Sequence, residues 1–220
     1  MLARDALRQA VKTTLAPALR AQGFRGTYPT WRLQREGDVV LVNLFGNKFN
    51  EGPYGDFALS IGVVPAAWWA WSHECAQGDI LFESESRPGK EQPWDCLYST
   101  AVRPRGRREQ WPVDANQDVT GVGEAMTAAA LRALPAVLEL TGPGQLAAAI
   151  QAGKAALTGA SSAISGGPEM SLAVLLSDIG GAELVAACTT LESVAEHSTS
   201  PMPRRTLPWV RRRAGLDDAS

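Results

Sequence analysis

One alternating segment constrains the fold of this chain more than any other feature. Bulky apolar residues stand at every second position and small residues stand between them: Phe57, Leu59, Ile61 and Val63 against Ala58, Ser60 and Gly62. Successive side chains of a β-strand point to opposite faces of its sheet. The segment therefore predicts a strand with one bulky face and one nearly bare face, and we expect the bulky face to share a core with Val40, Val42 and Leu44.

Two more strand patterns precede this segment. Residues 27–36 form one predicted strand, closed by Gly37-Asp38, and residues 39–45 form its hairpin partner. The turn residues 50–53 then lead into the alternating strand. Three strands in succession favour an antiparallel meander. Further strands are predicted at 80–83 and 96–102, which gives a sheet of about four to six strands.

Helical periodicity dominates the rest of the chain. Leu7, Val11, Leu15 and Leu19 recur every four residues in a predicted N-terminal helix over 2–22, where Pro17 predicts a kink or a new first turn. Helices are also predicted at four later ranges: 119–140, 145–157, 171–179 and 182–196. The sequence thus predicts an α+β fold, with the N-terminal helix across one face of an antiparallel sheet and a helical segment at the C-terminus.

Composition along the chain suggests four consecutive regions. We expect an α+β domain over 1–157, a flexible connection over 158–170, a packed helical hairpin over 171–197 and a Pro- and Arg-rich tail over 198–220. The tail has too many prolines to predict regular structure.

Charge and cysteine content restrict the possible functions. The 220 residues carry a formal net charge of -2, which argues against a dedicated nucleic-acid-binding protein. The three cysteines are irregularly spaced, and the N-terminus lacks the apolar run of a signal peptide. We therefore expect a soluble cytoplasmic protein with no disulfide, no membrane segment and no cofactor.

Motifs for metal binding or catalysis are incomplete. His73 and Cys75, with Cys96 further on, contain metal-binding residue types without a fourth spaced ligand, so we expect buried thiols and no metal site. The chain has no Gly-x-Ser-x-Gly motif. Gly121-Val122-Gly123 is interpreted as a helix-entry loop. The pair Glu83 and Glu85 suits acid–base chemistry only if the structure brings these carboxylates into a pocket.

Three closely spaced tryptophans form the first candidate binding segment. A helix would place Trp68 and Trp71 on one face and turn Trp69 toward His73. The segment either closes one end of the core or presents Trp69, Trp71 and His73 to a protein partner.

The bare strand face is the second candidate. A helix can cover it, or it can form a groove for a small polar ligand, lined by Arg32, Asn43 and Ser60. Two arginine clusters, at 103–108 and at 204–213 around Trp209, are interpreted as solvated or partner-docking segments, with single-stranded nucleic acid as the alternative.

Several segments together are similar to a bacterial domain family of unknown function. The resemblance rests on Leu15-Ala16-Pro17-Ala18-Leu19, Gly23-Phe24, Trp31-Arg32, Val42-Asn43-Leu44 and Phe57-x-Leu59-x-Ile61-Gly62, with Trp111 and Leu134-Pro135 later in the chain. It covers roughly residues 5–195 and implies an α+β fold without an established activity. The family tends to have a polar residue, often Gln, where this chain has Phe45.

The function that we expect from the sequence is a non-enzymatic one. A protein-binding or accessory module, of which an immunity-type protein is one kind, fits the incomplete catalytic motifs together with the tryptophan segment. The alternative is a small-ligand binder or an enzyme that uses the sheet face around Arg32, Asn43 and Ser60.

Overall fold

The computed structural model describes residues 1–46, 50, 52–75, 86–106, 108–157 and 167–216. The chain forms two units, and each unit combines several separate stretches of sequence. The sheet unit comprises Met1–Gln34, Val40–Gly62 and Ser99–Glu139. The helical unit comprises Arg35–Val39, Val63–Tyr98 and Leu140–Ser220.

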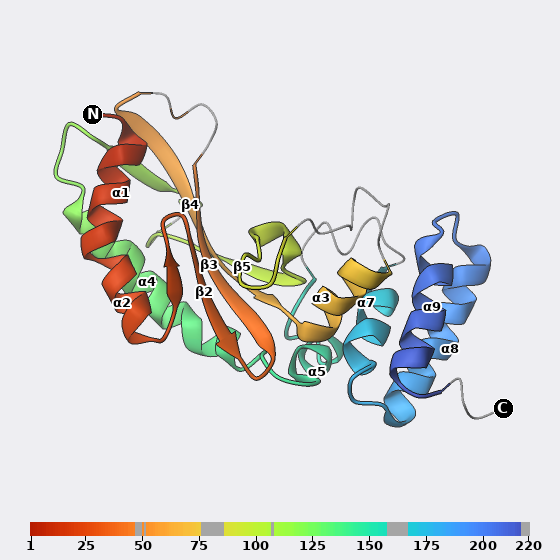
Figure 1. The fold of residues 1–220 in the computed structure, drawn as a ribbon. Helices are drawn as coiled ribbons and strands as arrows, with labels where there is room; N and C mark the ends of the chain where they lie inside the picture. Colours follow the sequence, from red (N-terminus) through yellow and green to blue (C-terminus); the bar gives the residue numbers. More distant parts are fainter. Residues whose placement is uncertain (47–49, 51, 76–85, 107, 158–166, 217–220) are drawn as a thin grey trace. The chain divides into compact units, whose positions relative to one another are not determined.

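The antiparallel meander predicted from the sequence is confirmed. Along the sheet the strands follow the order β1-β2-β3-β4-β5, and β6 pairs with β4 (Figure 1). Their bounds are β1 Arg25–Thr27, β2 Thr30–Arg35, β3 Asp38–Gly46, β4 Tyr54–Val64, β5 Tyr98–Val102 and β6 Trp111–Asp114. The short strand β6 was not predicted, because Pro112 interrupts its pattern. The predicted strand at 80–83 and the pair Glu83 and Glu85 lie outside the described residues.

The segment 27–36, predicted as a single strand, instead contains the tight turn between β1 and β2. In the register of this hairpin Gly26 lies opposite Trp31, and Thr27 lies opposite Thr30. Gly26 has a φ of +114°, and a Cβ at this position would lie 2.6 Å from the Thr30 carbonyl oxygen. The close approach of the two strands therefore requires glycine.

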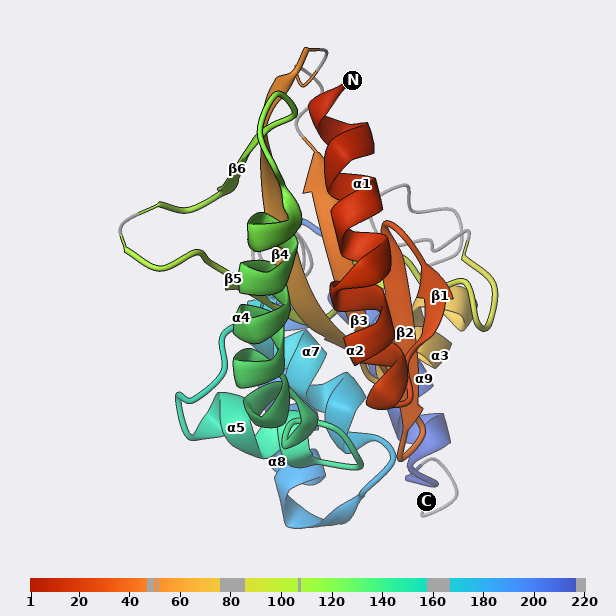
Figure 2. The ribbon, with the colours of Figure 1, turned by 90° about the vertical axis from the view of Figure 1, so that its left-hand side faces the viewer.

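Three helices cover one face of the sheet: α1 Ala3–Thr13, α2 Leu15–Ala21 and α4 Thr120–Leu138 (Figures 1 and 2). Pro17 lies in the first turn of α2, where its missing N–H breaks no helical hydrogen bond. Gly123 lets α4 approach α1, because a Cβ there would lie 2.6 Å from Thr14 Oγ1 and 3.2 Å from Ala10 Cβ. The Gly121-Val122-Gly123 segment is thus part of a helix that packs against α1.

The bulky face of β4 is buried, as its alternation predicts. Phe57, Leu59, Ile61 and Val63 are each at most 1% exposed, and Val40, Val42 and Leu44 are also buried. A Cβ on Gly46 would lie 3.2 Å from the Phe57 ring, so β3 approaches β4 closely on this side. The hydrophobic pattern of the sequence therefore identified the covered face of the sheet.

The helical unit is built around α3 Ala66–Glu74, α5 Gln145–Gln151, α7 Gly167–Leu176, α8 Gly181–His197 and α9 Met202–Arg213. Its core contains Trp68, Trp71, Met170, Leu191 and Trp209. The expectation of an irregular C-terminal tail is wrong, because residues 202–213 form a helix with Trp209 and Val210 buried. Pro203 occupies its first turn, where proline is tolerated.

The remaining described segment of this unit contains a 3-10 turn, η1 Pro93–Asp95. In the part of the chain that the structure describes, we found no helix with the length and apolarity that a membrane span requires.

Candidate functional site

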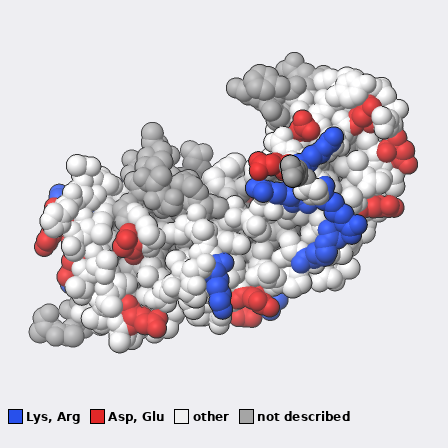
Figure 3. Space-filling model, turned by 180° about the vertical axis from the view of Figure 1, so that it is seen from behind, with Lys and Arg blue, Asp and Glu red and all other residues white. Residues whose placement is uncertain are grey.

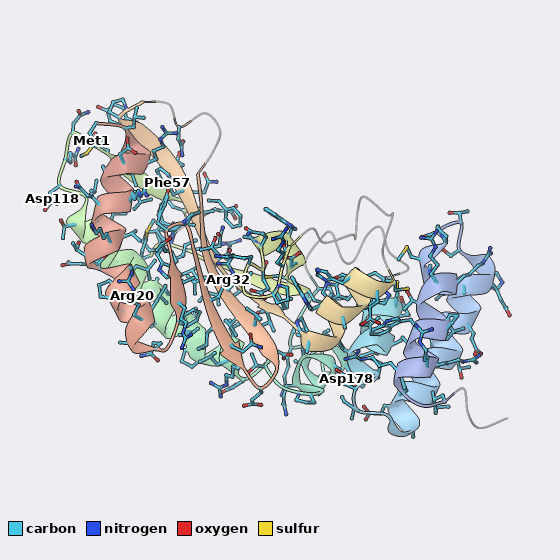
Figure 4. The ribbon with its side chains drawn as sticks, in the orientation of Figure 1. Met1, Arg20, Arg32, Phe57, Asp118 and Asp178 are labelled. Carbon is cyan, nitrogen blue, oxygen red and sulfur yellow. The ribbon has the colours of Figure 1, made fainter. Side chains whose placement is uncertain are left out.

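A groove in the sheet unit runs between the first two helices and the β1–β2 hairpin. We call it the N-terminal groove, and its volume is about 520 Å³. Met1 and Arg20 lie toward opposite ends of the α1–α2 pair (Figure 4). The groove is lined by Met1, Asp5, Arg8, Gln9, Val11, Lys12, Ala16, Arg20, Thr27, Tyr28 and Trp31.

The amphipathic pattern of α1 creates one wall. Leu7, Ala10 and Val11 face the core, whereas Arg8 and Lys12 are exposed and stand four residues apart. Side chains at this spacing lie on the same face of a helix. Thr14 ends α1, and the following helix α2 places Ala16 and Arg20 on the same groove. The wall thus combines an apolar base with a basic rim.

The base of the groove is apolar and contains an unsatisfied hydrogen-bond donor. Val11 and Trp31 are fully buried, and Ala16 is 4% exposed. The indole Nε1–H of Trp31 finds no hydrogen-bond acceptor among the described residues. Most buried polar atoms in proteins have a partner, and leaving one unsatisfied costs about 1–3 kcal/mol.

Three other buried indoles, those of Trp71, Trp111 and Trp209, donate hydrogen bonds. Trp111 donates to the Val102 carbonyl oxygen at 2.8 Å, and Trp71 donates to Thr206 Oγ1 at 3.0 Å. Trp209 donates to a carboxylate oxygen of Glu74 at 3.0 Å. The indole of Trp31 departs from this pattern, and it does so in the wall of a groove.

The rim of the groove attracts anions. Of the described residues that line it, three are basic (Arg8, Lys12 and Arg20) and one is acidic (Asp5). The Asp5 carboxylate lies 3.8 Å from the Arg4 guanidinium, which offsets its charge. All four lining side chains are exposed, so their field acts on a ligand that enters from solvent.

Tyr28 connects the rim to the base. The Arg8 guanidinium lies over the Tyr28 ring, 5.9 Å from its centroid, which is a cation–π distance. Burial raises the pKa of the Tyr28 phenol above its ordinary value, although the charges of Arg8 and Arg4 oppose this effect. The phenol is therefore protonated at neutral pH and can donate a hydrogen bond into the groove.

The sheet-face candidates lie apart from this groove on β2, β3 and β4. Thr30 Oγ1 donates to Asn43 Oδ1 at 2.5 Å, and both residues are buried. This bond joins β2 to β3, so the Asn43 amide is part of the packing between strands. Arg32 and Ser60 are half-buried. The interpretation of Arg32, Asn43 and Ser60 as one ligand-binding face stays a prediction.

The tryptophan segment forms helix α3 of the helical unit. Trp68 and Trp71 stack with ring centroids 4.6 Å apart and belong to the core. The expectation that Trp71 shares an exposed surface is wrong, because Trp71 is fully buried and bonded to Thr206. Trp69 is half-buried, and its ring lies 4.0 Å from the His73 ring. The pattern of helical spacing thus separated Trp69 from its neighbours correctly.

His73 is occupied by structural contacts. Its Nδ1 lies 2.8 Å from the Trp69 carbonyl oxygen, and its Nε2 lies 2.9 Å from the Ser86 carbonyl oxygen. These contacts attach Ser86 to α3. His73 therefore serves to hold the Trp69 side chain and residue 86 in place.

The three cysteines are free thiols in the helical unit. Burial raises the pKa of the thiols of Cys75, Cys96 and Cys188, which keeps them protonated. Within the described ranges, no three His, Cys, Asp or Glu side chains are grouped in a way that suits a metal ion.

The arginines of α9 bind within the helical unit. Arg211 forms an ion pair with Glu192, and Arg213 forms one with Asp178 while its guanidinium lies 5.1 Å from the centre of the Trp209 ring. Arg204 Nε donates to the Ala195 carbonyl oxygen. These three arginines attach α9 to the preceding helices, which explains much of the basic cluster at 204–213.

The other arginine cluster lies on the segment between β5 and β6. Arg103, Arg105 and Arg108 are exposed there. Figure 3 shows Lys and Arg side chains gathered in one area of the face that is seen from behind. Arg103 forms an exposed ion pair with Glu109. Arg107 lies outside the described residues.

Comparison with known families agrees with the resemblance seen in the sequence. A family model described as a domain of unknown function (DUF4304) matches residues 15–130, which is more than half of the chain. The chain belongs to this family. No curated protein and no solved structure matches the chain. The DUF4304 segment contains Arg20, Tyr28 and Trp31, whereas Arg8 and Lys12 precede it.

The N-terminal groove was not predicted from the sequence. Its signal was the basic pair Arg8 and Lys12 on the polar face of a helix, which is also the ordinary pattern of a solvated surface. Only the fold shows that Trp31, on a strand, lies behind that pair.

Proposed function

We propose that this chain is a non-enzymatic binding protein whose sheet unit holds a small anionic ligand in the N-terminal groove. The observation that carries the proposal is the basic rim of this groove, where exposed Arg8, Lys12 and Arg20 stand beside the half-buried Tyr28 ring. The volume of about 520 Å³ falls in the range of ordinary small-molecule sites. The proposal replaces the sheet face with the opposite, helix-lined side of β2 as the ligand site.

The groups in the groove suit binding more than chemistry. Guanidinium, ammonium and phenol groups are all hydrogen-bond donors that can hold an anion. The nucleophilic thiols belong to the helical unit, and both ring nitrogens of His73 contact carbonyl oxygens. These positions support a role in recognition.

The proposal is tested by following the indole N–H signals of ¹⁵N-labelled protein during titration with sodium benzoate, sodium decanoate and sodium phosphate. The Trp31 signal is assigned as the one lost in Trp31→Phe. We expect at least one of these anions to shift the Trp31 signal saturably, and the Arg8→Gln/Lys12→Gln variant to weaken that response. The variant Arg132→Gln, which removes an exposed charge on α4, should respond like the parent protein. A Trp31 signal that none of the three anions moves would refute the proposal.

A second candidate function is recognition of a protein partner by the segment from Trp68 to His73. It is supported by the half-buried position of Trp69 outside the core that contains Trp68 and Trp71. If Trp69 is a binding hot spot, Trp69→Ala should lower partner affinity by about 2 kcal/mol or more and stability by less than about 1 kcal/mol. Pull-down yield and urea midpoint, measured on the same variant, test this candidate. A large loss of stability would assign Trp69 to the core and remove its support.

A further inference from the structure

We propose that the edge of β5 binds an extended acidic segment of a protein partner. This segment adds to the sheet as a further strand and places its carboxylates on the arginines that follow β5. The site is separate from the N-terminal groove and does not rest on it. Three observations lead to the proposal: the position of β5 in the sheet, the composition of the outer strands and the arginines beside β5.

Strand β5 lies at an edge of the sheet. It ends the strand order, and among the described strands its neighbour is β4 (Figure 2). Alternate N–H and C=O groups of an edge strand point away from the sheet and can pair with another chain. Ser99 and Thr100 are half-buried and Ala101 is exposed, so solvent reaches this strand. An extended peptide can therefore pair with it through main-chain hydrogen bonds.

The other outer strands of the described sheet are protected against such pairing. β1 has only three residues and includes the charged Arg25. β6 contains Pro112, which has no N–H to donate. Short length, charge and proline are devices by which proteins block their sheet edges. β5 has five uncharged residues, lacks proline and includes Tyr, Thr and Val, which favour strands. β5 is therefore the outer strand that best accepts a peptide.

Residues 103–110, which we call the arginine loop, determine the charge of the occupant. Among their described side chains Arg103, Arg105 and Arg108 are basic and Glu109 is acidic, and all four are exposed. Arg103 pairs with Glu109, but an ion pair in contact with solvent contributes little. Guanidinium groups bind carboxylates through charge-assisted hydrogen bonds. An acidic peptide therefore complements this loop.

One hydrogen bond holds the arginine loop at the end of β5. Trp111 Nε1 donates to the Val102 carbonyl oxygen at 2.8 Å, and both residues are buried. The bond joins the last residue of β5 to the first residue of β6, so the loop begins and ends beside the strand edge. A single-stranded nucleic acid could use the arginines, but it has no peptide backbone to pair with β5. The combination of edge and arginines thus favours a peptide.

The probe is a fluorescein-labelled octapeptide of two glutamates, Thr-Val-Thr-Val and two further glutamates. One altered peptide has glutamine for every glutamate, and another is N-methylated on its four central amides. We expect each altered peptide to bind the intact chain about tenfold or more weakly than the acidic peptide. Fluorescence anisotropy measures the affinities. Amide hydrogen exchange at Ser99, Thr100 and Ala101, followed by NMR, should slow in the complex, because amides that faced water become hydrogen-bonded.

Matched variants test the arginine loop. Arg105→Gln/Arg108→Gln should weaken binding of the acidic peptide about tenfold. The control Arg25→Gln/Arg132→Gln removes the same charge from exposed positions elsewhere in the sheet unit and should leave the affinity unchanged. Thermal melting verifies that both variants fold. If Arg105→Gln/Arg108→Gln does not fold, the glutamine peptide tests the same contacts on the unmodified chain.

Several outcomes would overturn the proposal. These are no binding of the acidic peptide, binding that leaves amide exchange on β5 unchanged, or equal affinity for either altered peptide. A decathymidylate oligonucleotide that binds as tightly and displaces the acidic peptide would assign the arginine loop to single-stranded nucleic acid. Slow exchange on β5 without peptide, lost on dilution, would assign the edge to a second copy of the chain. The Trp31 signal is read separately, so failure here leaves the proposed function of the N-terminal groove intact.

Discussion

The indole Nε1 of Trp71 donates a hydrogen bond to Thr206 Oγ1 over 3.0 Å, and it thereby joins two helices of the helical unit, α3 and α9, from positions 135 residues apart in sequence. Thr206 and Trp71 are both fully buried. The bond explains why a segment rich in proline and arginine is ordered as a helix. It attaches α9 to the core through a polar contact as well as through Trp209 and Val210.

Thr206→Val should therefore lower the free energy of unfolding by about 1 kcal/mol, because it keeps the shape of the side chain and removes one hydrogen bond of the Trp71 indole. Thr206→Ser retains the hydroxyl and should cost less. Urea unfolding followed by tryptophan fluorescence measures both. Equal costs for the two variants would show that the methyl group, and not the hydrogen bond, matters.

Trp31→Phe should cost less stability than Trp111→Phe. Both changes remove a similar ring volume from the buried interior of the sheet unit. Only Trp111→Phe also breaks a hydrogen bond, the one to the Val102 carbonyl oxygen, which should add about 1 kcal/mol. Urea midpoints of the two variants, without added ligand, make the comparison. A larger loss for Trp31→Phe would show that the Trp31 indole already has a partner.

Leu59→Ala should lower the free energy of unfolding by about 2–5 kcal/mol, because Leu59 is 1% exposed on the covered face of β4. Ser60→Ala, on the neighbouring half-buried position, provides the control and should have a small effect. Chemical denaturation of both variants measures their free energies of unfolding. A cost for Leu59→Ala below about 0.5 kcal/mol would contradict the assignment of the buried face.

Ionisation of the buried Asp38 carboxyl should make the helical unit less stable as the pH rises. Burial raises the pKa of its carboxyl above the ordinary value of 3.8, and Asp178 and Glu36 add to this effect, against hydrogen bonds from the Ala66 and Gly142 N–H groups. Between the unfolded and the folded pKa the native state binds more protons than the unfolded state, so stability falls with increasing pH through that window.

Asp38→Asn removes this titration. The stability of the parent protein relative to Asp38→Asn should increase as the pH is lowered from 7 toward 4. Urea midpoints of both proteins across this range provide the measurement. A difference that stays constant, or that shrinks on acidification, would contradict the raised pKa.

The sequence predicted those parts of the fold that local patterns determine. The alternation from Phe57 to Val63 identified β4 and its buried face, and Pro17 marked the first turn of α2. The division of 27–36 into two strands was missed, because it depends on the approach of Gly26 to the Thr30 backbone. Helix α9 was missed because its prolines disfavour a helix when the segment is considered alone. The helix is stabilised by the tertiary contacts of Thr206 and Trp209.

The candidate site was harder to predict for a physical reason. Arg8 and Lys12 on a helix, Tyr28 in a turn and Trp31 on a strand have no common sequence pattern. Trp69, by contrast, was separated from Trp68 and Trp71 by helical spacing alone. A site built on one element can be read from periodicity, and a site shared by several elements needs the fold.

The division of the chain into two units determines which of its fragments can fold alone. The backbone passes from one unit to the other five times, at residues 34–35, 39–40, 62–63, 98–99 and 139–140. The segment matched by the family model contains Trp68, Trp71 and Leu97, whose core neighbours Met170, Leu191 and Trp209 all follow it. A fragment of residues 15–130 would display those apolar side chains to water. Neither unit can therefore be obtained as an autonomous folding piece by a single truncation, and binding studies require the intact polypeptide.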